Sequence, residues 1–506
     1  MHLQTASALP VLKVSKGIMQ VHISRSAAVV RRRNPRRALA STANFPRRAL
    51  QGEASQAPTS SLSSSLTKST LSRHQGRPWV AYRSFSTSAK RQSDEHSQTA
   101  STHVFNAAQH RPLEGVLVVA LEQVISGPYC TRQLADLGAR VIKIERPGTG
   151  DFVRYHDKRV LGKLCSHFVW TNKNKESLAL DIKKPEDLEI LKELIKKADV
   201  FVQNLVPGAA ARMGLSFDEL KKTNDRLIMC EISGYGSDGP YKTKKAYDLL
   251  VQSEAGLLSI TGTPDEPSKV GCSIADISAG MYAYSSIMAA LLQRQKTGKG
   301  CRIDVSMLES MVEWMGFPLL YASEGQSPPP RYGASHASIY PYGPFEAGDG
   351  TVMLGLQNER EWSILCEKVL EMPELEKDAR FTNTGLRSQN RKELYEIICD
   401  KFKEDTAAAI VEKLEKAGIA NARLRELSDV WEHPQLKARE RFIEIETEAG
   451  PVRTTLTPGM DGREAQPRLD PVPGIGQHND SILAEFGLGS KSAQEQISGR
   501  DAEMSV

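Results

Sequence analysis

Acidic side chains are almost missing from the first ninety residues, where Glu53 is the single acid among eleven arginines and four lysines. The same segment is rich in Ser and Ala, and this composition is typical of an organelle transit peptide. The stretch 83–90 is similar to matrix-protease cleavage sites, with Arg83 two residues before a cut after Phe85. We therefore predict a disordered mitochondrial transit peptide over 1–90, a linker over 91–110, and a mature protein in the mitochondrial matrix.

The rest of the chain lacks a basic excess. The whole chain carries +5 and residues 1–90 carry 15 − 1 = +14, so the other 416 residues carry 5 − 14 = −9. An acidic globular part does not favour nucleic acid as a partner. The chain also has no apolar run long enough to span a bilayer, so we expect no membrane association.

Several chemical signatures are missing as well. The seven cysteines are scattered, odd in number and without CxxC spacing, which predicts neither disulfides nor a metal site, but reduced core residues. The turn after the first expected strand, 124–130, lacks the GxGxxG spacing of a dinucleotide site, which argues against nicotinamide or flavin chemistry. The chain also has no Walker, HExxH or GxSxG motif. We expect no permanently bound cofactor and no metal.

What the chain does have is a regular alternation of short apolar runs and helical patterns, which predicts a mostly parallel α/β sheet covered on both faces. Strands are expected at 116–121, 141–145, 177–182, 199–204 and 227–232, and helices at 129–137, 185–197 and 217–223. After a Pro-rich stretch at 326–331, a strand at 351–355 and helices at 361–370, 391–402 and 406–416 indicate a second, smaller α+β domain.

These patterns predict seven regions along the chain. They are a transit peptide (1–90), a linker (91–110), a large domain (111–323), a linker (324–337), a small domain (338–431), a segment returning to the large domain (432–487) and a tail (488–506).

One acidic residue, Asp276, ends a short apolar run and precedes the small residues Ser278, Ala279 and Gly280. We expect Asp276 to be the N-cap of a helix, because a carboxylate accepts hydrogen bonds from first-turn amides. Those amides and the helix dipole would keep the carboxylate ionised, and the small residues would leave room for a ligand. An ordinary N-cap and a nucleophile beside an oxyanion site are both compatible with this segment alone.

Motifs along 111–487 together resemble the class III CoA-transferases, the family of formyl-CoA transferase, carnitine CoA-transferase and α-methylacyl-CoA racemase. The matching segments are 113–116, 126–128, 136–148, 172–175, 199–204, 207–208, 212–215, 234–240, 246–248, 275–282 and 296–300. The resemblance implies a large Rossmann-like domain with a smaller α+β domain, in an interlocked homodimer.

The resemblance also implies site residues. Asp276 matches the covalent nucleophile of the family, whose carboxylate attacks the donor thioester and passes the acyl group on without hydrolysis. The residues that match coenzyme A contacts are Val124, Arg146, Leu180, Asn204, Arg212, Lys245 and Tyr247. Arginine and lysine suit the phosphates of coenzyme A. Acyl-CoA and a carboxylic acid are then the small-molecule substrates.

Two residues indicate which branch of this family the chain resembles. Tyr247 stands where racemases have the histidine of a Gly-His-Asp motif, and a phenol is a poor base near neutral pH. Ile125 stands where formyl-specific members have Gln, so formyl and oxalyl substrates are in doubt. A racemase and a non-catalytic CoA-binding protein stay open as alternatives.

The sequence as a whole is similar to those of mitochondrial enzymes that move CoA from succinyl-CoA to glutarate, hydroxymethylglutarate or itaconate. The stretch 333–342 resembles theirs. A second carboxylate in a closed site needs cationic or multi-donor partners. Our candidates are Arg331, His336, Tyr340 and Tyr342.

Overall fold

The computed structural model describes residues 111–328, 330–459 and 467–488. The predicted transit peptide, the linker before residue 111 and the tail after residue 488 lie outside these residues. In the described ranges no helix is both long and apolar enough to cross a bilayer.

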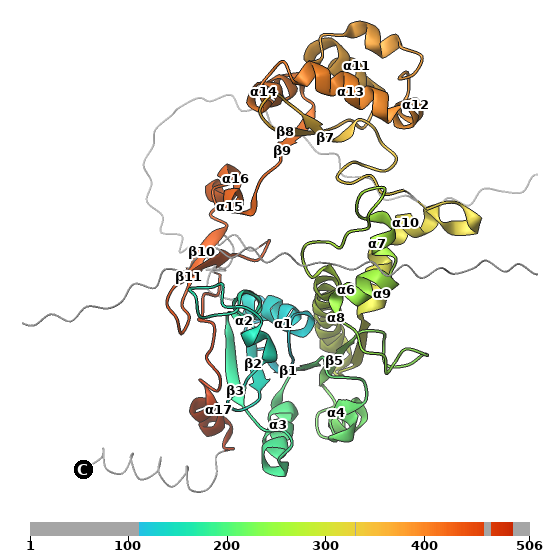
Figure 1. Cartoon of the computed structure of the whole chain (residues 1–506). Coiled ribbons are helices and arrows are strands. Elements are labelled where there is room, and N and C mark those ends of the chain that lie inside the picture. Colours follow the sequence, from blue (N-terminus) through green and yellow to red (C-terminus); the bar gives the residue numbers. More distant parts are fainter. Residues whose placement is uncertain (1–110, 329, 460–466, 489–506) are drawn as a thin grey trace, which may run out of the picture. The chain divides into compact units, whose positions relative to one another are not determined.

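Six parallel strands form the central sheet, in the order β3-β2-β1-β4-β5-β6 (Figure 1). They are β1 (Leu117–Leu121), β2 (Arg140–Glu145), β3 (Lys175–Ala179), β4 (Val200–Gln203), β5 (Ile228–Ser233) and β6 (Arg302–Ser306). This is the strand order of a Rossmann fold, in which ligands bind outside the carboxyl ends of the strands. The predicted fold class, a Rossmann-like sheet with a second α+β part, is confirmed.

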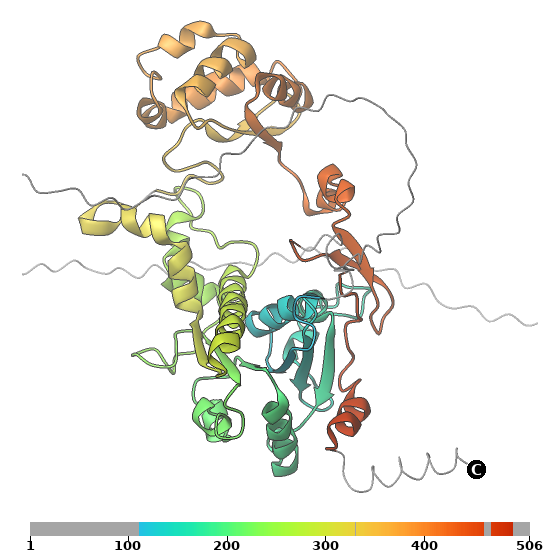
Figure 2. The same ribbon diagram turned by 180° about the vertical axis from the view of Figure 1, so that it is seen from behind.

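Helices cover both faces of the sheet, and each face has its own apolar core. One face packs against α1 (Ser126–Asp136) and α8 (Ile274–Thr297), which lie side by side in Figures 1 and 2. The other face packs against α3 (Pro185–Lys197) and the distant α17 (Asn479–Phe486). The sheet is therefore buried on both sides, as its nearly continuous apolar strands predict.

Shorter elements of the large domain connect and flank the sheet. They are η2 (Phe152–Tyr155), α2 (Ser166–Asn172), α4 (Ala209–Arg212), α5 (Phe217–Leu220), α6 (Asp248–Glu254), α7 (Leu257–Ile260), α9 (Met307–Trp314) and α10 (Gly316–Tyr321).

The predicted element boundaries differ from the structure in two informative places. Helix α1 begins at Ser126 rather than Tyr129, because Pro128 falls in the first turn, where a missing N–H costs nothing. The third strand runs over Lys175–Ala179 rather than 177–182, because Lys175 is buried in an ion pair and so belongs to the sheet.

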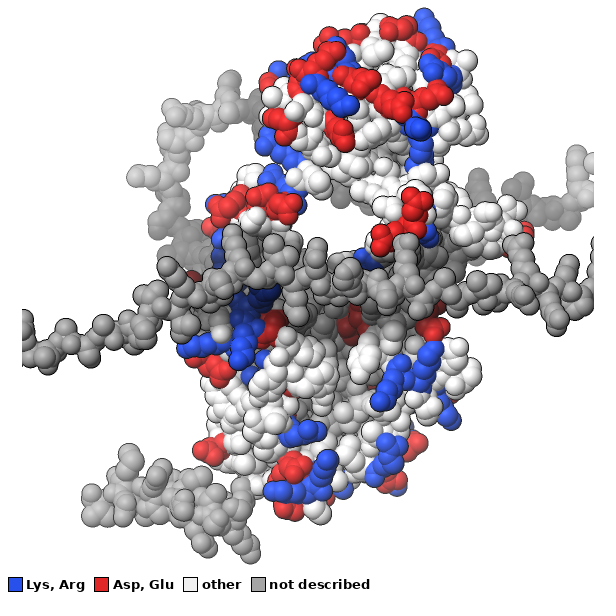
Figure 3. Space-filling model, in the orientation of Figure 1, with Lys and Arg blue, Asp and Glu red and all other residues white. Residues whose placement is uncertain are grey.

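The second part of the chain has its own core. A three-stranded antiparallel sheet, β7 (Tyr342–Glu346), β8 (Thr351–Gly355) and β9 (Ala420–Arg423), packs with α11 (Glu359–Ile364), α13 (Arg391–Phe402) and α14 (Ala407–Ala417). Two further strands, β10 (Phe442–Ile445) and β11 (Val452–Thr455), form a hairpin. On the face in Figure 3, basic and acidic side chains are mixed over the helices of this second part, which is the pattern of a solvated surface.

The cysteines only partly follow expectation. All seven are free and five are buried, as predicted for reduced core residues. Cys272 is exposed and Cys301 is half-buried, so those two are not core residues. Cys272 lies in the turn before α8, where the apolar run that suggested burial is too short to reach the core.

Candidate functional site

A cavity of about 370 Å³ lies at the carboxyl ends of β1, β4 and β5. It brings together five of the residues predicted from the sequence. They are Val124, Asn204, Lys245, Tyr247 and Asp276. These come from segments up to 152 residues apart, and the packing of α6 and α8 at the strand ends brings them together.

Asp276 is not the N-cap residue that we expected. Helix α8 begins at Ile274 after Ser273, so Asp276 is its third residue, and Ser273 makes no side-chain cap bond. The capping carboxylate belongs to Asp248, which accepts from the backbone N–H of Ala275 at 2.7 Å and of Asp276 at 3.2 Å. Asp248 satisfies first-turn donors, and the Asp276 side chain is left at the cavity wall.

The electrostatics of Asp276 also differ from expectation. Its side chain is half-buried, and the pKa of its carboxyl is raised to about 7, first by burial and then by the Asp248 carboxylate, while a hydrogen bond from Ser126 opposes both. The predicted stabilisation of the ionised form is therefore wrong, because the first-turn amides point at Asp248 instead. A carboxyl poised near neutral pH is typical of functional sites.

The small residues after Asp276 serve packing rather than ligand access. Ser278, Ala279 and Gly280 are buried. A Cβ atom on Gly280 would lie 2.8 Å from the backbone oxygen of Ser126 and 2.9 Å from the ring of Tyr129. Gly280 therefore lets α8 approach α1 closely, and this contact fixes where Asp276 sits.

The loop after β1 is held in a strained shape at the cavity. Val124 has φ of 65°, which is a sparsely populated conformation for a β-branched residue. Its N–H donates to both carboxylate oxygens of Asp151, at 3.2 and 3.1 Å. Asp151 is fully enclosed and pairs with buried Lys143 at 3.0 Å. No sequence pattern predicts this buried pair, because Lys143 looks like any charged residue in a strand.

Asn204 fastens the same loop from the other side. Its side-chain oxygen accepts from the N–H of Gln123 at 2.9 Å, and its side-chain nitrogen donates to the carbonyl of Gln123 at 2.8 Å. A predicted ligand contact is thus also a clamp on the backbone that leads to Val124.

A second cavity of about 200 Å³ contains two more predicted residues, Arg146 and Leu180, together with Lys183. It shares Gln123 and Leu205 with the first cavity. Arg146 is exposed just after β2 and Leu180 is buried just after β3. The two cavities therefore adjoin, with Asp276 on the wall of the first and Arg146 and Lys183 on the wall of the second.

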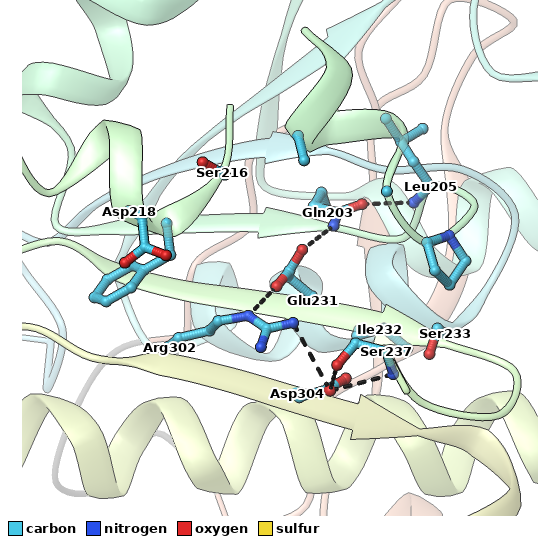
Figure 4. Close-up of a pocket in the computed structure, with 14 residues that line it drawn as sticks. Gln203, Leu205, Ser216, Asp218, Glu231, Ile232, Ser233, Ser237, Arg302 and Asp304 are labelled. Carbon is cyan, nitrogen blue, oxygen red and sulfur yellow. Dashed lines mark hydrogen bonds and ion pairs between the residues drawn. The ribbon is translucent and has the colours of Figure 1, made fainter. Parts of the chain in front are cut away.

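A third cavity of about 400 Å³ adjoins the first and shares Leu205, Pro207, Ile232 and Ser233 with it. Figure 4 shows Arg302 lying between Glu231 and Asp304, while Gln203 donates to Glu231 at 2.8 Å. The acids outnumber the single arginine on this wall, so it disfavours a phosphate.

The remaining predicted residues do not line either of the first two cavities. Arg212 ends α4 and is exposed, and Ile125 is 5% exposed at the start of α1. The Arg331 guanidinium donates to the backbone oxygens of Thr263 at 2.8 Å and Pro264 at 2.9 Å.

His336, Tyr340 and Tyr342 belong to the second part of the chain. The Nδ1 atom of His336 accepts from the N–H groups of Ser338 and Ile339, and its ring stacks on Tyr342 with centroids 5.4 Å apart. Tyr340 is only 3% exposed, packs in that core, and has its pKa raised by burial. Tyr342 remains exposed.

Comparisons with known proteins identify the family of the chain. The family model described as "CoA-transferase family III" matches residues 113–479. The chain is 37% identical over 391 residues to "Succinyl-CoA:glutarate CoA-transferase" of Mus musculus, covering 76% of this chain and 89% of that protein. It is 35% identical over 364 residues to "Acetyl-CoA:oxalate CoA-transferase" of Acetobacter aceti, covering 71% and 93%. Among solved structures, a CAIB/BAIF family protein from Brucella suis superposes with a TM-score of 0.67 at 33% identity, covering 75% of this chain and all of that one.

Proposed function

The chain belongs to CoA-transferase family III and is a CoA-transferase, and we propose that it moves CoA from succinyl-CoA to a free dicarboxylic acid through a covalent intermediate on Asp276. The observation that carries this proposal is the position of Asp276. Its half-buried carboxyl lies on the wall of a cavity that adjoins the cavity lined by Arg146 and Lys183. An acyl-CoA laid along both cavities has its thioester at the carboxyl and its phosphates at the cations.

The chemistry follows from keeping the acyl group activated. The Asp276 carboxylate attacks the thioester carbonyl, and the C–S bond breaks to give a mixed anhydride and CoA thiolate. The thiolate then attacks the aspartyl carbonyl, which releases the donor acid and leaves an aspartyl-CoA thioester. The acceptor carboxylate repeats both steps in reverse. Every intermediate stays at the energy of an anhydride or thioester, so water must be kept out.

The binding residues take separate parts in this proposal. Arg146 provides a planar fork for the CoA phosphates, and Leu180 provides an apolar floor beside it. Val124 and Asn204 shape the loop over which the pantetheine arm runs, and Lys245 and Tyr247 flank the thioester end. Arg212 is exposed at the end of α4, and we assign it to the CoA phosphates as well.

The dicarboxylate acceptor is supported by the names of relatives. Three relatives that are 31–37% identical to this chain are named for CoA transfer that pairs succinyl-CoA or succinate with glutarate or mesaconate. We propose glutarate, hydroxymethylglutarate or itaconate as the acceptor here. His336, Tyr342 and Arg331 are our candidates for the second carboxylate, and Tyr340 supports them from within the core.

We also propose an interlocked homodimer in the mitochondrial matrix. Helices α9 and α10 expose Trp314, Phe317 and Leu320, apolar side chains suited to a subunit interface. Light scattering should show a dimer, and that dimer should not exchange subunits with a tagged form of the protein. A monomer would refute the proposal.

N-terminal sequencing should find that the protein from isolated mitochondria begins near residue 86. An intact Met1 in protein from the cytosol would refute the proposed targeting.

The test of function is a panel of acids offered with succinyl-CoA, with CoA transfer followed by chromatography. We expect dicarboxylates of four to six carbons to accept CoA and Asp276→Ala to transfer none. Deuterium uptake at the α-carbon of a methyl-branched acyl-CoA, without transfer, would favour a racemase instead. CoA binding with no turnover on any acid would favour a non-catalytic protein.

A further inference from the structure

Outside the catalytic cavity, three side chains of unlike chemistry converge on one point. The Sγ atom of Cys165 lies 3.4 Å from Oδ2 of Asp157 and 4.0 Å from Nδ1 of His167. That Nδ1 atom lies 3.5 Å from the same Oδ2. Among the described residues, these three offer ligand atoms that all lie within 4.8 Å of one another.

The local fold holds the three groups in place. Cys165 is the N-cap residue of α2 with extended backbone, and His167 is the second residue of that helix, so both side chains leave the same turn. Asp157 lies in the loop after η2, and its carboxylate accepts from the N–H of Ser166 at 3.0 Å and from the Ser166 hydroxyl at 2.8 Å. Such outer hydrogen bonds orient the ligands in metal sites.

The distances match one face of a metal-centred tetrahedron. With bonds of about 2.3 Å to sulfur and 2.0–2.1 Å to nitrogen and oxygen, a tetrahedral zinc ion separates its ligand atoms by about 3.6 Å (S···N), 3.5 Å (S···O) and 3.3 Å (N···O). The observed separations are 4.0, 3.4 and 3.5 Å. The S···N pair departs most, and a small rotation of the exposed His167 ring closes it.

Charge and access also suit a cation. A thiolate and a carboxylate together neutralise a divalent ion, and the imidazole adds no charge. Cys165 is 2% exposed, while the side chains of His167 and Asp157 are 41% and 22% exposed. An ion can therefore enter from the solvent side, and water can complete its coordination.

We propose that Asp157, Cys165 and His167 form a binding site for a thiophilic divalent cation, with zinc as the best match. A bound ion ties the loop after η2 to the start of α2. Phe152 of η2 lines the cavity that contains Asp276, so the ion steadies one wall of that cavity without touching substrate. The sequence did not reveal the site, because the spacing of these three residues matches no zinc signature.

Cobalt is the probe that tests the site. Full-length protein is treated with a chelator, dialysed and titrated with Co²⁺ while the absorption spectrum is recorded. We expect one ion per chain, with a thiolate-to-cobalt charge-transfer band and the intense visible bands of a tetrahedral ion. Zinc added in excess should remove the bands, and elemental analysis of the zinc-loaded protein should find one zinc per chain.

Variants assign the ligands. Cys165→Ser should abolish the charge-transfer band, and His167→Gln should weaken Co²⁺ binding at least tenfold. Because His167 is exposed, that variant should keep its circular dichroism spectrum. The matched control is Cys272→Ser, which removes an exposed thiol elsewhere and should leave the titration unchanged. Absence of the band in wild type, or its loss in Cys272→Ser and not in Cys165→Ser, overturns the site.

Discussion

Asp248→Asn is the substitution that most sharply tests the electrostatics of the site. Asp248 raises the pKa of Asp276, second to burial, and together they bring it from 3.8 to about 7. Asparagine keeps a side-chain oxygen for the N–H of Ala275 but removes the negative charge. Without that charge, the pKa of Asp276 should fall below about 7.

The sign of the effect follows from the nucleophile. Only the ionised carboxylate attacks, so wild-type kcat/KM should fall as pH drops through about 7. At pH 6, a carboxyl with a pKa of 7 is about one-eleventh ionised, so a lower pKa leaves room for a rise of at most about tenfold. Asp248→Asn should therefore raise kcat/KM at pH 6, relative to its value at pH 8, by up to about tenfold over wild type.

The assay is a pH profile of kcat/KM for succinyl-CoA between pH 5 and 9. Asp304→Asn is the matched control, since it removes an acid from the neighbouring cavity that does not act on Asp276. Its acidic limb should stay at the wild-type position. An acidic limb that does not move in Asp248→Asn would refute the reasoning, because the rate would then not report a carboxyl coupled to Asp248.

Three further substitutions probe the support of the site. Asp151→Asn should lower the free energy of unfolding in urea by about 3 kcal/mol, because a buried ion pair loses one partner. It should also raise the KM for succinyl-CoA, because the N–H of Val124 loses its acceptor. An unchanged KM would contradict this second expectation. Gly280→Ala should cost about 1–3 kcal/mol by overpacking and lower kcat, whereas Gly271→Ala, with open space around it, should do neither. His336→Ala should raise the KM for glutarate far more than for a monocarboxylate of similar length, and equal losses would mean that His336 does not read the second carboxylate.

Much of the fold could be predicted from sequence pattern because its causes are local. Apolar runs of strand length between amphipathic helices specify a parallel sheet, and helix 185–197 matches α3 at both ends, with Pro185 at its start. A parallel sheet then places all strand ends at one edge. The resemblance to class III CoA-transferases implied Val124, Arg146, Leu180 and Asn204 as ligand contacts, and each of them follows the end of a strand, where this geometry places a ligand.

The failures concern contacts between residues far apart in sequence. The cap of α8 comes from Asp248, 28 residues before Asp276, and no local pattern links the two. Burial, followed by the charge of Asp248, reverses the expected pKa shift of Asp276. Likewise, Lys143 and Asp151 look like ordinary charged residues, and only folding shows them paired and buried. Long-range pairing of charges is set by the tertiary structure, so single-residue reasoning does not find it.

The most direct test of the central claim is to trap the activated Asp276 carbonyl of the aspartyl-CoA thioester with hydroxylamine, which displaces CoA. Wild-type protein is incubated with succinyl-CoA, treated with hydroxylamine and digested with trypsin, and the peptides are analysed by mass spectrometry. Cleavage after Lys245, Lys269 and Arg294 puts Asp248 in the peptide 246–269 and Asp276 in the peptide 270–294, so the two acids are separated. The account predicts a hydroxamate on Asp276 alone, absent without succinyl-CoA and absent in Asp276→Ala. A hydroxamate in the peptide 246–269, or transfer that persists in Asp276→Ala, would contradict it.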